Sequence, residues 1–352
     1  MHMDRQKILI IVIQVVVVLS FLIVSAGGIQ FSGVKNGDVY VWGREIQQGP
    51  PQNGKLTVLT WNISYAYGIG SSGRGYIPHS PKEFQERLAR IGRVIRDSNA
   101  DIVFLQEVDF NSHRSHHVNQ LKELSQMTGL NFVAPAVSWQ ANYIPYPLWP
   151  IPHHFGKVYS GGAVLSRYPI LNNQVVLHPK PASNSWLRNM FYLFRYSQQV
   201  QIQIGSKNVI VLNNHLESYD KKNRIFQGAE LARLVELIDS SHYLIIFGGD
   251  MNTIPLEASV RRGFADDEKG NFSDDTTMEI ICDIHGFKEV VSPQSYLRNE
   301  PAYFTYPSDA PNRRLDYIFV PDNMKIVEAG VLKTGITSDH LPIKAVLEWN
   351  YN

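Results

Sequence analysis

The feature that most constrains this 352-residue chain recurs along it: six times, an apolar run that predicts a buried strand borders a residue able to handle a metal, a proton or a phosphate. A polar group at the end of a rigid strand is held in place without occupying the core. Several such positions in one chain predict that the fold gathers them into an active site. They are Asn62, Glu107, His215, Asp250, Asp316 and Ser338–His340.

Composition bounds the class of protein. At 44% hydrophobic content, the chain can bury the core of one large domain or two small ones. Its 33 basic and 32 acidic residues give a formal charge of +1, so no overall positive field predicts nucleic acid as the partner, although net charge says nothing about a local basic groove. Cys282 is the single cysteine, which excludes an intrachain disulfide and a thiolate zinc cluster.

The N-terminus carries a strong targeting signal. Arg5 and Lys7 precede the apolar run Ile8–Val24, and the small residues Ser25 and Ala26 resemble a cleavage site. We therefore expect residues 1–28 to be a signal peptide or a single-span membrane anchor. Basic residues at the short end of this segment favour a catalytic domain outside the cytoplasm, either membrane-anchored or secreted.

Three parts are expected along the chain: the leader (1–28), a linker over residues 29–54 with one short strand near 38–42, and a folded domain over residues 55–352. Ser80 followed by proline predicts the start of a helix, and a turn at Gly205 predicts a hairpin. Because hairpins are mixed with helix crossovers, the order predicts an α/β protein with mixed sheets.

Two aromatic segments, residues 139–159 and 185–196, interrupt this order. One interpretation is that their rings pack on one another or under a loop. The other is that they form a surface beside the site that stacks on a substrate or lies at a membrane, because Trp and Tyr favour the boundary between lipid and water.

Asn62 and Glu107 form a pair of hard oxygen ligands. A carboxylate and an amide carbonyl suit Mg²⁺, with Mn²⁺ as an alternative, because these ions take oxygen ligands and keep several waters. Each residue also has a structural interpretation, since an Asn after a strand often lies in a turn and a Glu is usually solvated.

The segment Gly248–Asn252 is more specific. Its glycines allow close approach of the backbone, Asp250 can orient or deprotonate a water, and Asn252 can donate to charge developing on a phosphate. The structural alternative is a simple Asp-x-Asn turn. The apolar run Tyr243–Phe247 that precedes it favours a buried strand instead.

Two imidazoles complete the set. In Ser338–His340 an imidazole follows a carboxylate, and a carboxylate partner fixes the tautomer of a histidine and raises its basicity. His215 could contact phosphate or protonate a leaving oxygen. The chain lacks His-Glu-x-x-His and Gly-x-Ser-x-Gly, which excludes the zinc peptidases and the serine hydrolases that carry these motifs.

Taken in order, these segments resemble the endonuclease/exonuclease/phosphatase superfamily over about residues 55–349. The resemblance implies a four-layer α/β sandwich, with two mixed β-sheets packed face to face and helices outside, preceded here by the N-terminal hydrophobic helix. It also implies a metal-dependent hydrolase of phosphoric ester bonds, with its site at one end of the sheets. The segments that carry it are Thr60–Asn62, Leu105–Glu107, Asn214–Ser218, Gly249–Asn252, Arg314–Ile318 and Ser338–His340.

On the metal side, the resemblance assigns three residues. Asn62 and Glu107 resemble the Mg²⁺ ligands of the family, and Asp339 resembles a further carboxylate beside the metal.

On the catalytic side, the resemblance assigns five. Asp250 resembles the residue that aligns the attacking water, and Asn252 resembles the amide that contacts the phosphate. His215 resembles the phosphate-stabilising histidine. His340 resembles the second catalytic histidine, with Asp316 as its orienting carboxylate. Which of these groups acts as acid and which as base is left open.

The motifs imply the reaction but not the substrate. Export, near-zero net charge and the aromatic segments favour a lipid headgroup or another small phosphodiester, with membrane contact through 139–159 and 185–196. The alternative is an extracytoplasmic endonuclease or DNA phosphodiesterase, because His215–Ser218 is most similar to tyrosyl-DNA phosphodiesterases. An inactive binding domain is a third interpretation, disfavoured because every expected catalytic residue is present.

A nuclease of this size would be expected to carry a basic stripe for phosphate contacts. The chain shows no dense basic cluster, but it offers scattered candidates for such contacts. These are Arg188, Arg195, Arg313, Arg314 and Lys333.

Overall fold

The computed structural model describes residues 12–16, 25, 30–43, 49, 51–68 and 77–349. Most of the predicted leader, part of the predicted linker and most of the glycine-rich loop after residue 67 lie outside the described residues. Residues 12–16 are helical, and among the residues described no helix is both long and apolar enough to cross a membrane.

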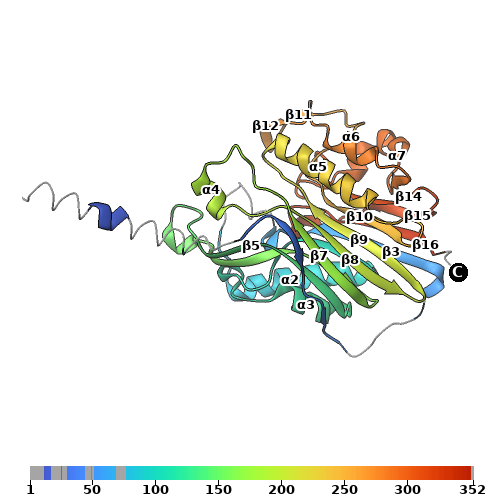
Figure 1. The fold of residues 1–352 in the computed structure, drawn as a ribbon, viewed down its shortest axis with the longest axis horizontal. Coiled ribbons are helices and arrows are strands. Elements are labelled where there is room, and N and C mark those ends of the chain that lie inside the picture. The colour runs from blue at the N-terminus through green and yellow to red at the C-terminus, as the bar shows by residue number, and fades with distance from the viewer. Residues whose placement is uncertain are drawn as a thin grey trace, which may run out of the picture.

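Two seven-stranded mixed sheets form the centre of the molecule (Figure 1). The first sheet contains β1 (Gly33–Asn36), β7 (Ile170–Leu177), β8 (Tyr196–Ile204), β9 (Lys207–His215), β10 (Leu244–Asp250), β14 (Asp316–Pro321) and β13 (Phe287–Glu289), in that spatial order. The second contains β15 (Ile326–Val331), β16 (Ile343–Glu348), β3 (Lys55–Asn62), β4 (Ile102–Asp109), β6 (Gly156–Ser166), β5 (Phe132–Ile144) and β2 (Tyr40–Val41). A separate hairpin pairs β11 (Arg262–Phe264) with β12 (Asp267–Asn271).

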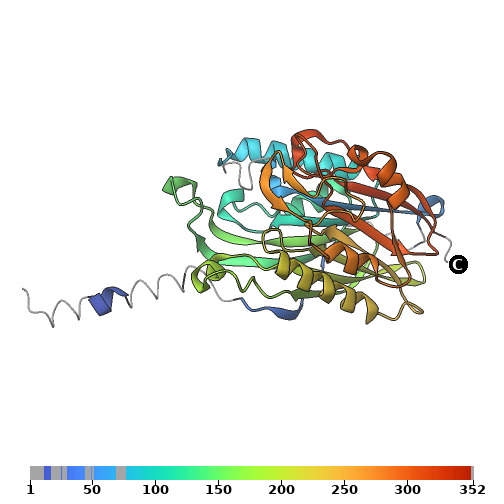
Figure 2. The same ribbon diagram turned by 90° about the horizontal axis from the view of Figure 1, so that it is seen from above.

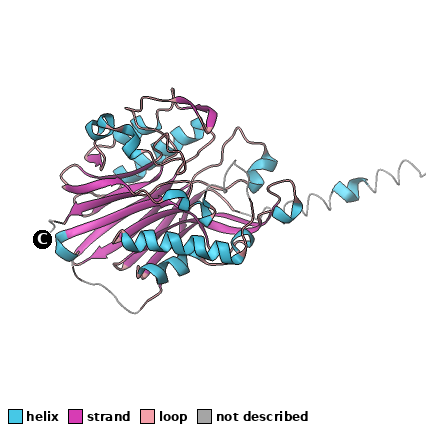
Figure 3. Ribbon diagram, turned by 180° about the vertical axis from the view of Figure 1, so that it is seen from behind, coloured by secondary structure: helices cyan, strands magenta, loops and turns pink. Residues whose placement is uncertain are grey.

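Helices cover the outer faces of both sheets, so the molecule has four layers. Figure 2 shows the sheets between α2 (Pro81–Asp97) on one side and α5 (Lys221–Glu236) on the other. Figure 3 shows α2 lying across the second sheet. The other helices are α3 (Gln120–Thr128), α4 (Trp186–Phe191), α6 (Thr277–Cys282) and α7 (Pro293–Arg298), with short 3-10 turns at 52–54, 64–66, 113–115, 151–153, 300–303 and 335–337.

The core explains the layering. A large buried cluster between the sheets joins residues such as Phe104 of the second sheet to Ile246 of the first. One outer cluster packs α2 and α3 on the second sheet, and another packs α5 and α6 on the first. The predicted α/β sandwich with two mixed sheets is therefore confirmed.

The helix predicted at Ser80 begins there. The Ser80 side chain accepts a hydrogen bond from the backbone N–H of Glu83, and the Glu83 carboxylate accepts one from the backbone N–H of Ser80 at 2.9 Å. This reciprocal cap satisfies two amide groups that a helix start otherwise leaves unpaired. The face that carries Phe84, Leu88 and Ile91 is buried, as its spacing predicts.

The segment expected to be a linker, residues 29–54, holds two strands of the sheets. β2 falls within the short strand expected near 38–42 and pairs with β5. β1 was not expected, and it pairs with β7 of the other sheet. Short polar strands at a sheet edge have little hydrophobic pattern, because only one of their sides meets a partner.

The first aromatic segment is mostly a hairpin arm and not a loop insertion. β5 continues to Ile144, β6 begins at Gly156, and the two strands pair along the arm, with Trp139 opposite Ser160. The sequence did not predict these strand extensions, because aromatic residues and prolines obscure the alternation that marks a strand.

Candidate active site

Three of the polar strand ends lie side by side in the first sheet. Asp250, at the end of β10, is opposite His215 of the parallel strand β9 and opposite Asp316 of the antiparallel strand β14. Backbone register therefore brings the imidazole and both carboxylates to one edge of the sheet. All three side chains are buried.

The two glycines before Asp250 let these strands approach closely. A Cβ atom on Gly249 would lie 2.0 Å from the carbonyl oxygen of Asn214, and one on Gly248 would lie 2.3 Å from that of Tyr317. Gly249 also has a φ of +129°, which a residue with a side chain rarely adopts. The glycines thus have the role expected from the sequence.

The second sheet supplies the facing residues. Asn62 ends β3, and Asp339 and His340 directly precede β16, which pairs with β3. Glu107 lies within β4 at a shift in the pairing register, with a φ of +56°. A bulge of this kind redirects a side chain out of the regular pleat.

Hydrogen bonds between buried amides tie the two sheets together at the site. The Nδ2 of Asn62 donates to Oδ2 of Asp250 at 3.0 Å. Beneath it, Nε2 of Gln106 donates to Oδ1 of Asn213 at 2.6 Å, and Nδ2 of Asn213 donates to the carbonyl of Leu105 at 3.0 Å. Gln106 and Asn213 were not expected in the site, although each stands out as an amide within an apolar run.

His340 is held by Asp316. Its Nδ1 lies 2.8 Å from Oδ2 of Asp316, its Nε2 lies 3.7 Å from Oδ2 of Asp250, and its ring packs on Tyr306 with centroids 4.8 Å apart. Burial lowers the pKa of His340, but the charges of Asp316 and Asp250 outweigh burial and raise it to about 10. The imidazole therefore holds its proton at neutral pH.

Asp250 lies between the two imidazoles. Its Oδ2 is 3.5 Å from Nε2 of His215 and 3.7 Å from that of His340. Burial raises the pKa of Asp250 to about 6, while His340 and the amide of Asn62 act to lower it. A carboxylate with a pKa so close to neutrality suits the handling of a proton.

His215 is neutral and has a partner that the predicted site did not include. Burial lowers its pKa well below the usual value, and the charge of Arg195 lowers it further. The guanidinium of Arg195 donates to Nε2 of His215 and to the hydroxyl of Ser218. This places a buried positive charge where the sequence predicted a histidine beside phosphate.

Arg195 enters from the second aromatic segment. Its Nε lies 3.8 Å from Oε2 of Glu217, whose Oε1 accepts a hydrogen bond from the hydroxyl of Tyr192 at 2.6 Å. From the sequence, Arg195 was predicted only as a candidate for contact with nucleic acid. Its place in the site depends on the turn from α4 into β8, which no local pattern encodes.

Two other arginines considered for nucleic-acid contact are committed to internal pairs. Arg313 pairs with Asp266 at 2.7 Å, and Arg314 pairs with Glu289. Both guanidinium side chains are buried, so neither belongs to an exposed basic stripe.

Glu107 lies close enough to Asp339 and Asp250 for their charges to act on its carboxyl group. Burial raises the pKa of Glu107 to about 7, and the nearby charge of Asp339 is the next cause. With Asn62 they offer oxygen donors only, and a divalent cation would neutralise the two carboxylates that the fold brings together. The donor set therefore fits Mg²⁺ or Mn²⁺.

Asp250, Asp316 and His340 are a second group that could hold a metal, with one ligand atom of each within 4.8 Å of the others. However, Nδ1 of His340 is already at hydrogen-bond distance from Asp316. This pairing suits proton transfer better than ligation.

Asn252 turns back toward β9. Its Nδ2 donates to the carbonyl of Leu216 at 2.9 Å, its backbone N–H donates to Oδ1 of Asp250 at 3.0 Å, and its φ is +50°. Asn252 itself is half-buried, and these two hydrogen bonds hold it beside Asp250.

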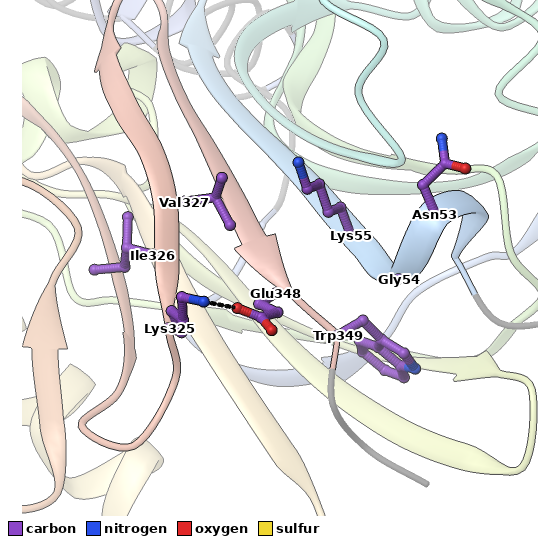
Figure 4. Close-up of a pocket in the computed structure, with 8 residues that line it drawn as sticks. All are labelled: Asn53, Gly54, Lys55, Lys325, Ile326, Val327, Glu348 and Trp349. Atoms are coloured by element: carbon purple, nitrogen blue, oxygen red, sulfur yellow. Dashed lines mark ion pairs between the residues drawn. The ribbon is translucent and has the colours of Figure 1, made fainter.

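A surface cavity of about 540 Å³ lies elsewhere (Figure 4). It is lined by Lys55 at the start of β3, whereas Asn62 is at the other end of that strand. Its Lys325–Glu348 pair is an ordinary surface contact. This cavity is not part of the cluster at the strand ends.

A family model for the endonuclease/exonuclease/phosphatase family matches residues 59–340, which include every polar strand end. The chain belongs to this family. Membership confirms the prediction of a metal-dependent hydrolase that acts on phosphoric ester bonds. No curated protein matches the chain in sequence.

Solved structures of family proteins share the fold. An endonuclease/exonuclease/phosphatase from Beutenbergia cavernae is 20% identical, with a TM-score of 0.57, over 84% of this chain and 71% of that one. TDP2 of D. rerio, complexed with a single-strand DNA product, is 15% identical, with a TM-score of 0.55, over 84% and 99%. A mannosyl-6-phosphatase of Bacteroides thetaiotaomicron is 18% identical, with a TM-score of 0.54, over 83% and 99%.

Proposed function

We propose that this protein is a Mg²⁺-dependent phosphodiesterase that acts outside the cytoplasm on a lipid headgroup or another small phosphodiester. The observation that carries the reaction is the position of Asp250. It accepts a hydrogen bond from Asn62 across the sheets and lies within 3.7 Å of two imidazoles that differ in charge. The carboxylate of Asp250 thus links Asn62, a predicted metal ligand, to the two histidines that handle protons.

Each side has its own chemistry. A divalent metal held by Asn62, Glu107 and Asp339 would neutralise phosphate charge and lower the pKa of a bound water. Asp250 aligns the attacking water and takes its proton. His340, kept protonated by Asp316, donates to a phosphoryl or leaving oxygen.

The other side of the phosphate meets fixed positive charge and amide donors. Arg195 supplies the charge, His215 holds Arg195 in place by accepting its hydrogen bond, and Asn252 offers an amide N–H. These groups are held in position before substrate arrives.

Three features favour a lipid or small phosphodiester. The N-terminal run Ile8–Val24 supports a domain attached to or exported across a membrane. The net charge is only +1, and Arg313 and Arg314 are buried in ion pairs. The aromatic segments 139–159 and 185–196 border the site and could meet a membrane lipid surface.

An extracytoplasmic nuclease or DNA phosphodiesterase is the second candidate. The likeness to TDP2, solved with a single-strand DNA product, favours it. So does Arg195, because a buried guanidinium beside the site would serve the phosphate of DNA as well as that of a lipid.

One assay of the full chain separates the two. Sphingomyelin, phosphatidylinositides, plasmid DNA and single-stranded DNA are each offered with Mg²⁺ and with EDTA. We expect metal-dependent release of a lipid headgroup, and a loss of about 100- to 1000-fold in Asp250→Asn. Asp274→Asn, which alters an exposed carboxylate, is the matched control and should retain full turnover.

Either of two results would overturn the proposal. Nicking of plasmid DNA without hydrolysis of any lipid would select the nuclease. Full turnover in Asp250→Asn would reject the mechanism for every substrate.

A further inference from the structure

The two aromatic segments divide their large apolar side chains into an inward and an outward set. Phe155 and Phe194 are buried, and Trp139 packs against the second sheet's outer core. Others point to solvent and form what we call the apolar rim. Its members are Leu148 (82% exposed), Trp149 (76%), Trp186 (72%), Ile151 (57%) and Leu187 (43%).

Two hydrogen bonds join the segments that carry the rim residues. Nε1 of Trp139 donates to the carbonyl of Phe191 at 2.9 Å, and the backbone N–H of Phe194 donates to the carbonyl of Ser138 at 2.9 Å. These bonds fix the β5–β6 arm against the segment that holds α4. Figure 1 shows α4 and β5 on the side of the molecule that faces residues 12–16.

The rim borders the active site. The segment that begins with Trp186 and Leu187 at the rim reaches Glu217 through Tyr192 and His215 through Arg195. Tyr219, which is 72% exposed, follows Glu217 and donates its backbone N–H to it at 3.0 Å. A headgroup at the catalytic cluster would therefore lie next to whatever the rim contacts.

Charge along this part of the chain is one-sided. From Leu124 to Leu216 the sequence has no Asp or Glu, although the whole chain carries 32 of them. The same stretch carries the basic residues Lys157, Arg167, Lys180, Arg188, Arg195 and Lys207. Of these, Lys157 beside the arm and Arg188 in α4 are exposed, and exposed cations next to apolar side chains are complementary to anionic lipid.

Ser25 contacts the same arm. Nδ2 of Asn142, near the end of β5, donates to the carbonyl of Ser25 at 2.7 Å. Ser25 directly follows the apolar run Ile8–Val24. The residue that follows the run in sequence thus contacts the arm.

We propose that the apolar rim docks the enzyme on an anionic lipid bilayer, with Leu148, Trp149 and Ile151 entering the interface. The inference rests on the proposed function in one respect: docking would supply the lipid phosphodiester that the proposed enzyme hydrolyses. Tryptophan suits the interface because its ring is apolar and its N–H can meet the headgroups.

The test uses the full chain carrying Val15→Asp and Val16→Asp, so that the apolar run does not itself enter the bilayer. This background protein is sedimented with vesicles of phosphatidylcholine, alone or mixed with phosphatidylglycerol. We expect binding to the mixed vesicles, and adding Leu148→Ser, Trp149→Ser and Ile151→Ser should weaken it on the order of 100-fold.

Matched controls come from apolar side chains exposed elsewhere. Leu237 and Leu297 are 70% and 61% exposed and lie outside the two segments, so Leu237→Ser with Leu297→Ser should leave binding unchanged. Thermal melts of both variants show that each is folded. Equal binding of the rim variant and the background protein, or rim-dependent binding of single-stranded DNA without vesicle binding, would overturn the proposal.

Hydrolysis of a soluble phosphodiester, bis(p-nitrophenyl) phosphate, separates this proposal from the enzymatic one. The rim variant should hydrolyse it at the rate of the background protein. Rim-dependent vesicle binding without any hydrolysis would reject the proposed function alone. Hydrolysis with rim-independent binding would reject the docking surface alone.

Discussion

The catalytic cluster and the apolar rim are neighbours that depart from the usual distribution of residues in opposite directions. In the cluster, Asp316, Asp250 and His340 are ionisable yet 0%, 1% and 5% exposed. In the rim, Leu148 and Trp149 are apolar yet 82% and 76% exposed. Burying ionisable groups and exposing large apolar ones both make the free energy of folding less favourable. Departures of this kind are expected at functional sites.

The two regions also differ in what fixes their geometry. Asp250 is in register with both His215 and Asp316, so backbone hydrogen bonds within the first sheet place these three groups, while His340 comes from the residues before β16 of the second sheet. Leu148, Trp149 and Ile151 of the rim lie beyond Ile144, the last residue of β5, at the far end of the hairpin arm, and Trp186 and Leu187 lie in α4. The arm could change in sequence without moving the cluster, so the fold sets the bond that is cut and the arm can select the molecule.

The largest effect should come from removing a reacting group while the rim stays intact. In His340→Ala we expect turnover of the soluble phosphodiester to fall about 1000-fold, because the group that donates a proton is lost. Vesicle binding should not change. Steady-state kinetics beside vesicle sedimentation would check both, with the exposed His285→Ala as control. Turnover within about tenfold of the unchanged protein would argue against a proton-donating role.

The cluster could be anticipated from sequence because its members stand at strand ends. An apolar run followed by a polar residue is a local signal, and strands that pair in one sheet carry such residues to a common edge. Arg195 had no such signal, because its position beside His215 depends on contacts between residues far apart in sequence.

The strands of the hairpin arm were not predicted from the sequence for a related reason. Trp139, Tyr143 and Tyr146 lie near prolines, and this composition is typical of loops. Pairing with β6 extends β5 to Ile144 nevertheless. A strand that owes its existence to its partner cannot be recognised from its own residues.

Arg114 joins the hairpin arm to β4, the strand that carries Glu107, and its loss should destabilise the fold. Its guanidinium pairs with Asp109 of β4 at 3.0 Å and lies 3.6 Å from the ring centroid of Tyr65, 4.8 Å from that of Phe155 and 5.1 Å from that of Trp139. In Arg114→Met the fully buried carboxylate of Asp109 loses its partner. We expect a loss of about 3 kcal/mol in the free energy of unfolding, measured by urea titration.

A second variant shows whether the lost partner is the cause. Arg114→Met combined with Asp109→Leu removes the stranded charge, so much of the stability should return. A loss below about 1 kcal/mol in the single variant would mean that the rings, and not the ion pair, hold the arm in place.

The smallest effect should come from neutralising Asp316, which acts through its contact with His340. Asp316→Asn keeps an oxygen that can accept the hydrogen bond from Nδ1, while it removes the charge that does most to raise the pKa of His340 to about 10. A raised pKa in the folded state means that the stabilising charge pair is complete below the unfolded pKa of about 6.5 and is lost as pH rises through about 10. If protonated His340 is the donor, the alkaline fall in kcat/KM should therefore move to lower pH by at least about one unit in the variant, with about a tenfold loss at neutral pH. An alkaline limb that stays in place while kcat falls would assign the titrating proton to another group and leave Asp316 with only a positioning role.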